Sequence, residues 1–167
     1  MKSKSILVLL VVVVGAAVFG GTVLATTPTP PPGLMTTILA QSTLDGPMKI
    51  QFLRAVITSH QLFANSDFYV VDNKFLPNAT TGWHSHPGPS VVTVAAGTVT
   101  NYESEHGRCA THVYSKGQSF VDAGGTDAHM LRNDSGAPAE TIAVQLIPAG
   151  ASRRIDVTPA PPGNCGS

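Results

Sequence analysis

Short segments rich in Val, Ile, Thr, Phe and Tyr follow one another along most of this chain, with turn-forming residues between them. Such segments are typical of β-strands, and Gly, Pro, Asn and Asp in the gaps are typical of turns. Many short strands at regular spacing predict an all-β sandwich or barrel. The predicted strands are residues 49–57, 68–75, 90–95, 98–103, 110–115, 119–122, 128–132 and 140–147.

Residues 1–25 have the features of an export signal. Lys2 and Lys4 give a positive start, an apolar run follows, and the segment ends in Val-Leu-Ala, which is typical of a cleavage site. We expect a secreted or extracytoplasmic protein that begins at Thr26 and keeps no stable membrane span. An uncleaved N-terminal membrane anchor is the alternative, because the uncharged stretch 5–29 is long enough to cross a bilayer of about 30 Å.

The rest of the chain divides into a spacer, one domain and a tail. Residues 26–40, rich in Pro and Thr, are expected to form an extended spacer, and 151–167 an irregular C-terminal tail. Residues 41–150 are enough for one compact domain and too few for two. Charged residues make up 12% of the chain and the formal net charge is zero, so no basic patch is available for nucleic acid.

The two cysteines, Cys109 and Cys165, are interpreted as a disulfide pair. Export favours the bond, since oxidising compartments preserve disulfides and the cytosol does not. Free or metal-directed thiols are the alternative, but neither cysteine lies in a CxxC pair or beside a histidine. The bond would tether the tail to the domain and add roughly 4 kcal/mol of stability by chain-entropy arithmetic.

Three histidines are spaced as the ligands of a metal site. His84 and His86 are two residues apart, so on a β-strand they project to the same face and can share one ion. A third ligand must come from a distant strand, and His129 is the candidate. His60, His106 and His112 are interpreted as ordinary histidines, because a single histidine is more often exposed or satisfied than a ligand. Trp83 is interpreted as core, with the pocket mouth as the alternative.

The residues around these histidines resemble the two motifs of the cupin family. Cupins are double-sheet jelly rolls, so the resemblance implies a double-stranded β-helix for residues 41–150. Cupins also pair edge to edge, which implies a homodimer as a candidate assembly. The first motif is matched by Gly82-Trp-His84-Ser-His86-Pro-Gly-Pro-Ser90 and Gly97, and the second by Gly117, Ala123-Gly-Gly125, His129 and Asn133.

This chain departs from the cupin pattern at three points. Ser90 stands where the family has glutamate, Ala123 stands where it has proline, and one extra residue separates Gly125 from His129. Similar cupins bind a divalent metal through three His and one Glu. The resemblance therefore implies His84, His86 and His129 as ligands of a divalent ion (Fe, Mn, Zn, Ni or Cu) and leaves the carboxylate unassigned.

Glu103 is one candidate to replace the missing carboxylate. If Ala96 and Gly97 form a two-residue hairpin loop, Ser90 lies opposite Glu103 on one face of the sheet. Cross-strand Cβ atoms are roughly 4.5 to 5.5 Å apart, near enough for a glutamate to reach a metal that Ser90 is too short to bind. The alternative, which we favour, is a solvated Glu103 at a strand end and a true three-histidine site.

Three functions fit this sequence. The first is an exported binding module for a divalent metal and a small ligand, which explains most simply why a glutamate and an acid–base pair are absent. The ligand is expected to be anionic, because neutral imidazoles leave the charge of the ion unbalanced. A metal-dependent, dioxygenase-like enzyme acting on a small organic acid or diketone is the second, with no catalytic residue assigned. A non-catalytic structural scaffold is the third. Fold alone cannot choose among them, since jelly rolls host unrelated functions.

Overall fold

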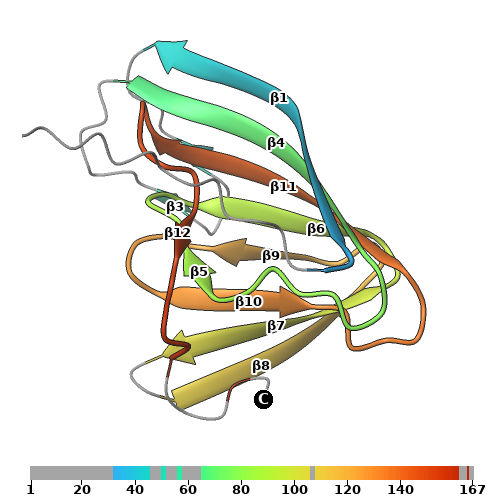
Figure 1. Ribbon diagram of the computed structural model, residues 1–167. Helices are drawn as coiled ribbons and strands as arrows, with labels where there is room; N and C mark the ends of the chain where they lie inside the picture. The colour runs from blue at the N-terminus through green and yellow to red at the C-terminus, as the bar shows by residue number, and fades with distance from the viewer. Residues whose placement is uncertain are drawn as a thin grey trace, which may run out of the picture.

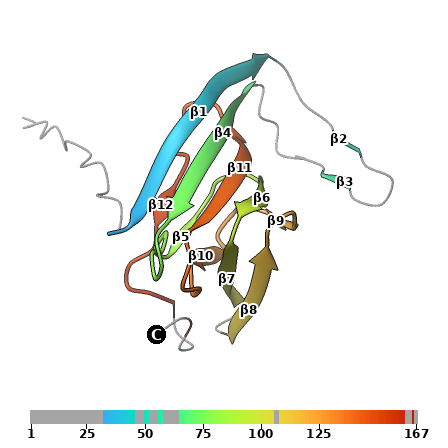
Figure 2. The same cartoon turned by 90° about the vertical axis from the view of Figure 1, so that its right-hand side faces the viewer.

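The computed structural model describes residues 32–45, 50–51, 56–57, 65–105, 108–161 and 165, and within these ranges every regular element is a β-strand. Two five-stranded antiparallel sheets face each other, and a two-stranded pair lies apart from them (Figures 1 and 2). The strands are β1 (Leu34–Asp45), β2 (Ile50–Gln51), β3 (Val56–Ile57), β4 (Asn65–Phe75), β5 (His84–Ser85), β6 (Ser90–Ala96), β7 (Thr98–Glu105), β8 (Arg108–Ser115), β9 (Ser119–Asp122), β10 (Ala128–Arg132), β11 (Ala139–Pro148) and β12 (Ile155–Asp156).

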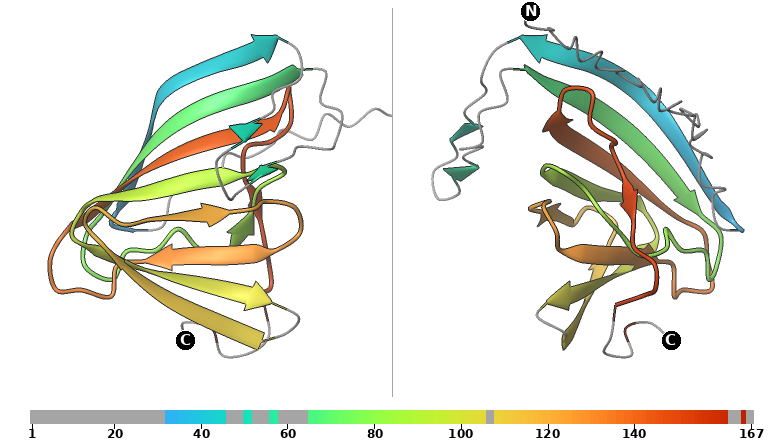
Figure 3. Two further views of the ribbon diagram at one scale, coloured as in Figure 1. Left: turned by 180° about the vertical axis from the view of Figure 1, so that it is seen from behind. Right: turned by 60° about the vertical axis from the view of Figure 1, so that its left-hand side comes forward.

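The chain passes repeatedly from one sheet to the other. The first sheet has the order β1-β4-β11-β6-β9, and the second has the order β12-β5-β10-β7-β8. Consecutive strands from β4 to β12 therefore change sheets at every step except between β7 and β8, as the view from behind also shows (Figure 3). This connectivity is a double-sheet jelly roll, which confirms the fold class predicted from the sequence.

Alternation along the strands sorts the side chains into a buried core and an outer surface. In β6, Val92 and Val94 are buried, whereas Val91, which projects from the other side of the sheet, is exposed. Val99 and Leu131 meet them from the second sheet. Burying alternate apolar side chains from two sheets is what holds such a sandwich together. The full core cluster is Tyr69, Val71, Phe75, Ala79, Val92, Val94, Val99, Phe120, Leu131, Ala139, Ala143 and Ile147.

At one end of the barrel the inward positions become polar. Ser90 on β6 is paired with Asp122 on β9 and with Gln145 on β11, and His129 on β10 is paired with His84 on β5. Paired residues of neighbouring strands project to the same side of a sheet. These five residues, which we call the polar layer, therefore face one another across the barrel, and it is this layer that contains the candidate site.

The predicted boundary between spacer and domain is too late. Residues 34–40, placed in the spacer, form the first part of β1, which pairs with β4 from Leu34 opposite Phe75 to Asp45 opposite Asn65. This strand directly follows the proline run and is exposed over much of its length. The tail is not wholly irregular either, because residues 155–156 form β12 and pair with β5.

The predicted strand at 49–57 is also wrong. Two short strands, β2 and β3, pair with each other in that region instead. The remaining predicted strands each coincide with one element to within three residues at either end, and 119–122 and 128–132 match completely. In the described part of the chain no helix is long and apolar enough to cross a membrane. The predicted signal, residues 1–25, lies outside the described residues, as do His60 and His106.

The predicted hairpin at Ala96-Gly97 does not form. Gly97 carries the chain from β6 in the first sheet to β7 in the second, so the two strands are not paired. Its φ is +69°, and a Cβ there would lie 2.5 Å from the carbonyl oxygen of Pro138. Glycine is needed because the backbones approach closely at this corner. Ser90 consequently does not lie opposite Glu103, and that step of the sequence argument is wrong.

Candidate metal centre

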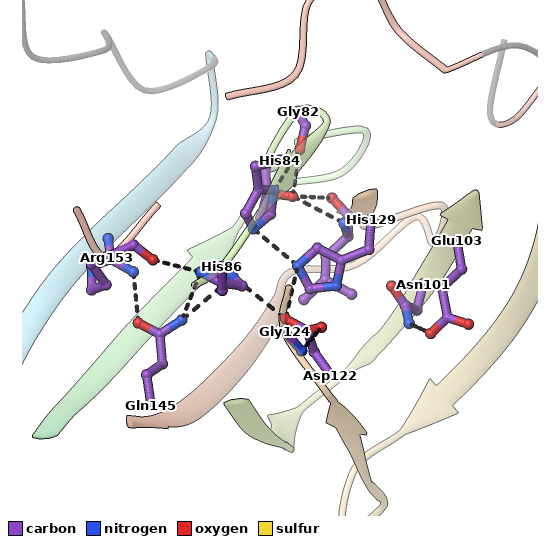
Figure 4. Close-up of polar contacts among 12 residues, drawn as sticks. Gly82, His84, His86, Asn101, Glu103, Asp122, Gly124, His129, Gln145 and Arg153 are labelled. Carbon is purple, nitrogen blue, oxygen red and sulfur yellow. Dashed lines mark hydrogen bonds and ion pairs between the residues drawn. The ribbon is translucent and has the colours of Figure 1, made fainter. Parts of the chain in front are cut away.

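The second sheet and the segment that leads from β5 to β6 bring His84, His86 and His129 together inside the barrel (Figure 4). His84 is on β5 and pairs with His129 on β10, while His86 follows the end of β5. All three are buried, with 4 to 5% of their surface exposed. One ring nitrogen from each lies within 4.8 Å of those of the other two, and the Nε2 atoms of His84 and His129 are 3.1 Å apart.

Backbone carbonyls orient two of the rings. The Nδ1 atom of His84 is 2.8 Å from the carbonyl oxygen of Gly82, and Nδ1 of His86 is 2.7 Å from that of Arg153. A carbonyl only accepts hydrogen bonds, so each Nδ1 carries the proton and donates it. In the neutral ring the Nε2 lone pair then faces the centre of the cluster, which is the tautomer that a metal ligand requires.

Burial keeps these imidazoles neutral. Desolvation lowers the pKa of all three, and for His84 the neighbouring His129 lowers it further. The pKa of His129 falls from 6.5 to about 4, although the carboxylate of Asp122 partly opposes the shift. Removing a charged group from water disfavours its charged form. At neutral pH each of the three rings is therefore uncharged and has one nitrogen without a proton, the form that binds a metal.

Glu103 does not join the cluster. It is opposite His129 in the second sheet, but its Oε1 atom accepts a hydrogen bond of 2.5 Å from Nδ2 of Asn101 on its own strand. In Figure 4 these two side chains lie to one side of the histidines, and the only contact drawn from Glu103 goes to Asn101. Glu103 therefore lies outside the cluster, as the favoured interpretation expects, and its half-buried carboxylate is hydrogen-bonded to Asn101.

A different carboxylate lies beside the histidines, and the sequence analysis missed it. The Oδ2 atom of Asp122 is 3.8 Å from Nε2 of His86 and 3.8 Å from Nε2 of His129. The signal was present, because Asp122 ends a correctly predicted strand. Asp122 was missed because Ser90 was expected to lie opposite Glu103. In the structure the residue opposite Ser90 on β9 is Asp122. Ser90 points inward as expected and is 1% exposed.

A cavity of about 540 Å³ opens onto the three histidines. Trp83 lines it and is half-buried, so the assignment of this tryptophan to the core is wrong. Arg153 and Arg154 line it from the segment after β11, which the sequence analysis had treated as irregular tail. The exposed His112, on β8, is not part of the site.

The two arginines differ in their partners. Nη1 of Arg153 donates to Oε1 of Gln145 at 3.0 Å. Arg154 donates from Nε to Oδ1 of Asp156 at 2.5 Å and from Nη2 to the carbonyl oxygen of Thr81 at 2.7 Å. Burial lowers the pKa of both guanidinium groups. Arginine nonetheless stays charged in proteins, so the cavity wall carries positive charge.

Cys109 and Cys165 are joined by a disulfide in the structure. Their Cα atoms are 5.3 Å apart, within the range that such a bond requires. Cys165 is buried, and Cys109 is on β8 at the edge of the second sheet. The bond therefore ties the chain beyond β12 back to the barrel.

Comparison with known proteins found similarity only at the level of structure. No protein-family model matches the chain, and no curated protein matches it. An oxalate oxidase structure is 18% identical over 57% of this chain, with a TM-score of 0.48. This chain spans about half of that protein, 51% of its length.

Two cupins are among the other similar structures. A cupin domain from Bordetella pertussis is 18% identical, with 71% of this chain and 98% of that chain covered and a TM-score of 0.45. A cupin-superfamily protein from Desulfitobacterium hafniense is 8% identical, with 72% and 84% covered and a TM-score of 0.47. The jelly roll with inward-facing motif histidines is the arrangement that the cupin resemblance implied. At such identities a similar fold says nothing about a shared substrate.

Proposed function

We propose that this protein binds one divalent metal ion through His84, His86 and His129, and a small anionic molecule beside that ion. The observation that carries the proposal is the convergence of three buried, neutral imidazole nitrogens within 4.8 Å. Ligand atoms about 2.0 to 2.2 Å from one ion lie roughly 3 to 4 Å from each other, so small side-chain movements would complete the coordination. Imidazole nitrogen suits Zn, Cu, Fe and Ni.

The two Nε2 atoms that lie 3.1 Å apart support a cation at this point. Two unprotonated nitrogens repel each other at that distance, because their lone pairs face one another. Either His129 carries its proton on Nε2 and donates it to His84, or a cation lies between the two nitrogens. His84 already carries its proton on Nδ1, where Gly82 accepts it. A metal ion satisfies both nitrogens without moving that proton.

Arg153 supports the second part of the proposal, the anionic ligand. Its guanidinium lines the same cavity as the histidines, and among the described residues no carboxylate pairs with it. A half-buried positive charge without an opposite charge is costly, and an anion in the cavity would remove that cost. A carboxylate bound to an open metal position and to Arg153 would use the planar, forked donor that arginine offers.

The location outside the cytoplasm is also part of the proposal. The sequence of residues 1–25 supports it through its positive start, apolar run and cleavage-like end. The disulfide between Cys109 and Cys165 supports it independently, because such bonds persist in oxidising compartments.

Elemental analysis and metal titration of the purified protein test the metal site. We expect about one ion per chain in the wild type and its loss in His84→Ala, His86→Ala and His129→Ala. His112→Ala is the matched control, because this histidine is exposed on β8 and should leave binding unchanged. A wild-type protein that takes up no divalent metal, or histidine variants that bind as tightly as the wild type, would overturn the proposal.

Calorimetry of the metal-loaded protein with small mono- and dicarboxylic acids tests the anionic ligand. Arg153→Gln should weaken binding at least about 10-fold, since charge-assisted hydrogen bonds contribute about 1.5 to 3 kcal/mol. Arg108→Gln, at an exposed position on β8, is the control. Equal affinities in the two variants would remove the role of Arg153. Oxygen uptake with the same acids separates a binding module from an oxygenase.

A further inference from the structure

Asp122 is buried against the three histidines with one oxygen atom unsatisfied. Its side chain is 10% exposed, and its Oδ2 atom has no hydrogen-bond partner among the described residues. The same Oδ2 atom is 3.8 Å from the Nε2 atoms of His86 and His129. A carboxylate oxygen is thus directed at the centre of the cluster, and among the described residues no lysine or arginine pairs with it.

The loop after β9 fixes this orientation. The other oxygen, Oδ1, accepts a hydrogen bond of 2.9 Å from the backbone N–H of Gly124, which turns Oδ2 toward the histidines. The next N–H, that of Gly125, donates to the carbonyl oxygen of His86 at 2.7 Å. The loop that holds Asp122 is therefore bonded directly to the segment that holds His86.

Close backbone contact locks the two segments together. Gly124 has a φ of +75°, and a Cβ there would lie 2.4 Å from the carbonyl oxygen of Gly88. Only glycine allows the loop after β9 to approach the His86 segment so closely. The position of Asp122 relative to His86 is consequently set by the backbone and does not depend on a flexible surface loop.

From this geometry we propose that Asp122 is the fourth ligand of the metal ion, in place of the glutamate that the first cupin motif lacks here. The inference rests on the proposed metal site. An unpaired buried carboxylate is expensive, whereas a cation at the cluster centre would satisfy its Oδ2 atom together with three nitrogen lone pairs. Ser90 occupies the motif position, and Asp122 is its direct partner on the neighbouring strand. The carboxylate has moved one strand across the same face.

A fourth, anionic ligand changes the character of the site. Three neutral imidazoles leave a dipositive ion with its full charge, and one carboxylate halves that charge. An oxygen ligand also favours harder ions such as Mn²⁺ and Fe²⁺ over Cu²⁺. Positions remain open on a six-coordinate ion for water or for an anion held by Arg153, so the anionic ligand still has a place to bind.

The test is Asp122→Asn, which keeps the size and the bond to Gly124 but removes the charge. Competition titrations with a chromophoric chelator, using Mn²⁺ and Co²⁺ at fixed pH, should show affinity more than about 100-fold weaker, because even indirect supports of metal ligands cost 10- to 100-fold. Asp127→Asn makes the same charge change at an exposed position of the same loop and should bind like the wild type.

Thermal unfolding separates a ligand from a structural residue. In chelator-treated protein Asp122→Asn should unfold at the wild-type temperature or higher, because it removes an unpaired buried charge. With saturating metal the order should reverse, since metal binding stabilises the wild type more. Equal destabilisation with and without metal would overturn the proposal in favour of a structural role.

A second variant relocates the carboxylate. Adding Ser90→Glu to Asp122→Asn places the acidic group on the partner residue of the same pair and should restore affinity toward the wild type. If that crowded double variant does not fold, the single variant still decides.

The failure of this inference is distinguishable from the failure of the metal site. If the wild type binds metal, the histidine variants lose it and Asp122→Asn binds within a few-fold of the wild type, Asp122 is not a ligand and the three-histidine site stands. A wild type that binds no metal overturns both proposals.

Discussion

Acid should destabilise the metal-free protein through His129. The folded-state pKa of this residue is about 4, whereas the ordinary value is 6.5. Below pH 6.5 the unfolded chain therefore takes up a proton that the folded chain still excludes. This contribution to stability is therefore fully present above pH 6.5 and is lost as the pH falls toward 4. The shift corresponds to about 3 kcal/mol, a large share of the 5 to 15 kcal/mol typical of a domain.

Urea denaturation in the presence of a chelator, at a series of pH values from 7.5 to 4, measures this effect. The wild type should lose stability with a slope that is steeper by about 1.4 kcal/mol per pH unit than that of His129→Gln, because one proton is involved. His112→Gln, in which an exposed histidine is replaced, should keep the wild-type slope. Parallel curves for the wild type and His129→Gln between pH 6.5 and 4.5 would refute the reasoning.

Three further outcomes are expected. Replacing Cys109 by Ser should lower the free energy of unfolding by roughly 4 kcal/mol, because the bond to Cys165 closes a loop with a sequence separation of 56; urea denaturation measures it. Gly124→Ala should weaken both metal affinity and stability, as measured by metal titration and urea denaturation. Gly136→Ala is the control and should change neither, because no atom lies within 4 Å of the added Cβ. Mass spectrometry of the secreted chain should find an N-terminus near Thr26, and an intact N-terminus in a membrane fraction would support the anchor instead.

Local sequence patterns were enough to predict most of the strands. Residues 119–122 and 128–132 were bounded correctly because apolar alternation and flanking turn residues act over a few positions. The strand at 34–45 was missed, since its threonines and polar residues follow a proline run and read as a continuation of it. The two-residue strands β5 and β12 are too short to carry any periodic signal.

Strand partners could not be derived from local patterns. Gly97 is compatible with a hairpin or with a crossing between sheets, and only the close approach to Pro138 distinguishes them. The same uncertainty hid Asp122, because its neighbours in space come from strands far away in the sequence. Arg153 was missed for a related reason, since a segment without periodicity gave no indication that it would line the cavity. The three histidines were found because their spacing resembles a motif.

The polar layer has a consequence for how such sites change in evolution. Several strands each contribute one inward residue to this level of the barrel, and all of these residues face the same small volume. A ligand lost on one strand can be regained on its neighbour by a single substitution, with no change in backbone. Evolution then conserves the set of ligand side chains in the polar layer, whereas the positions of these residues along the sequence can change. Proteins that share this chemistry can fail every test of linear motif spacing.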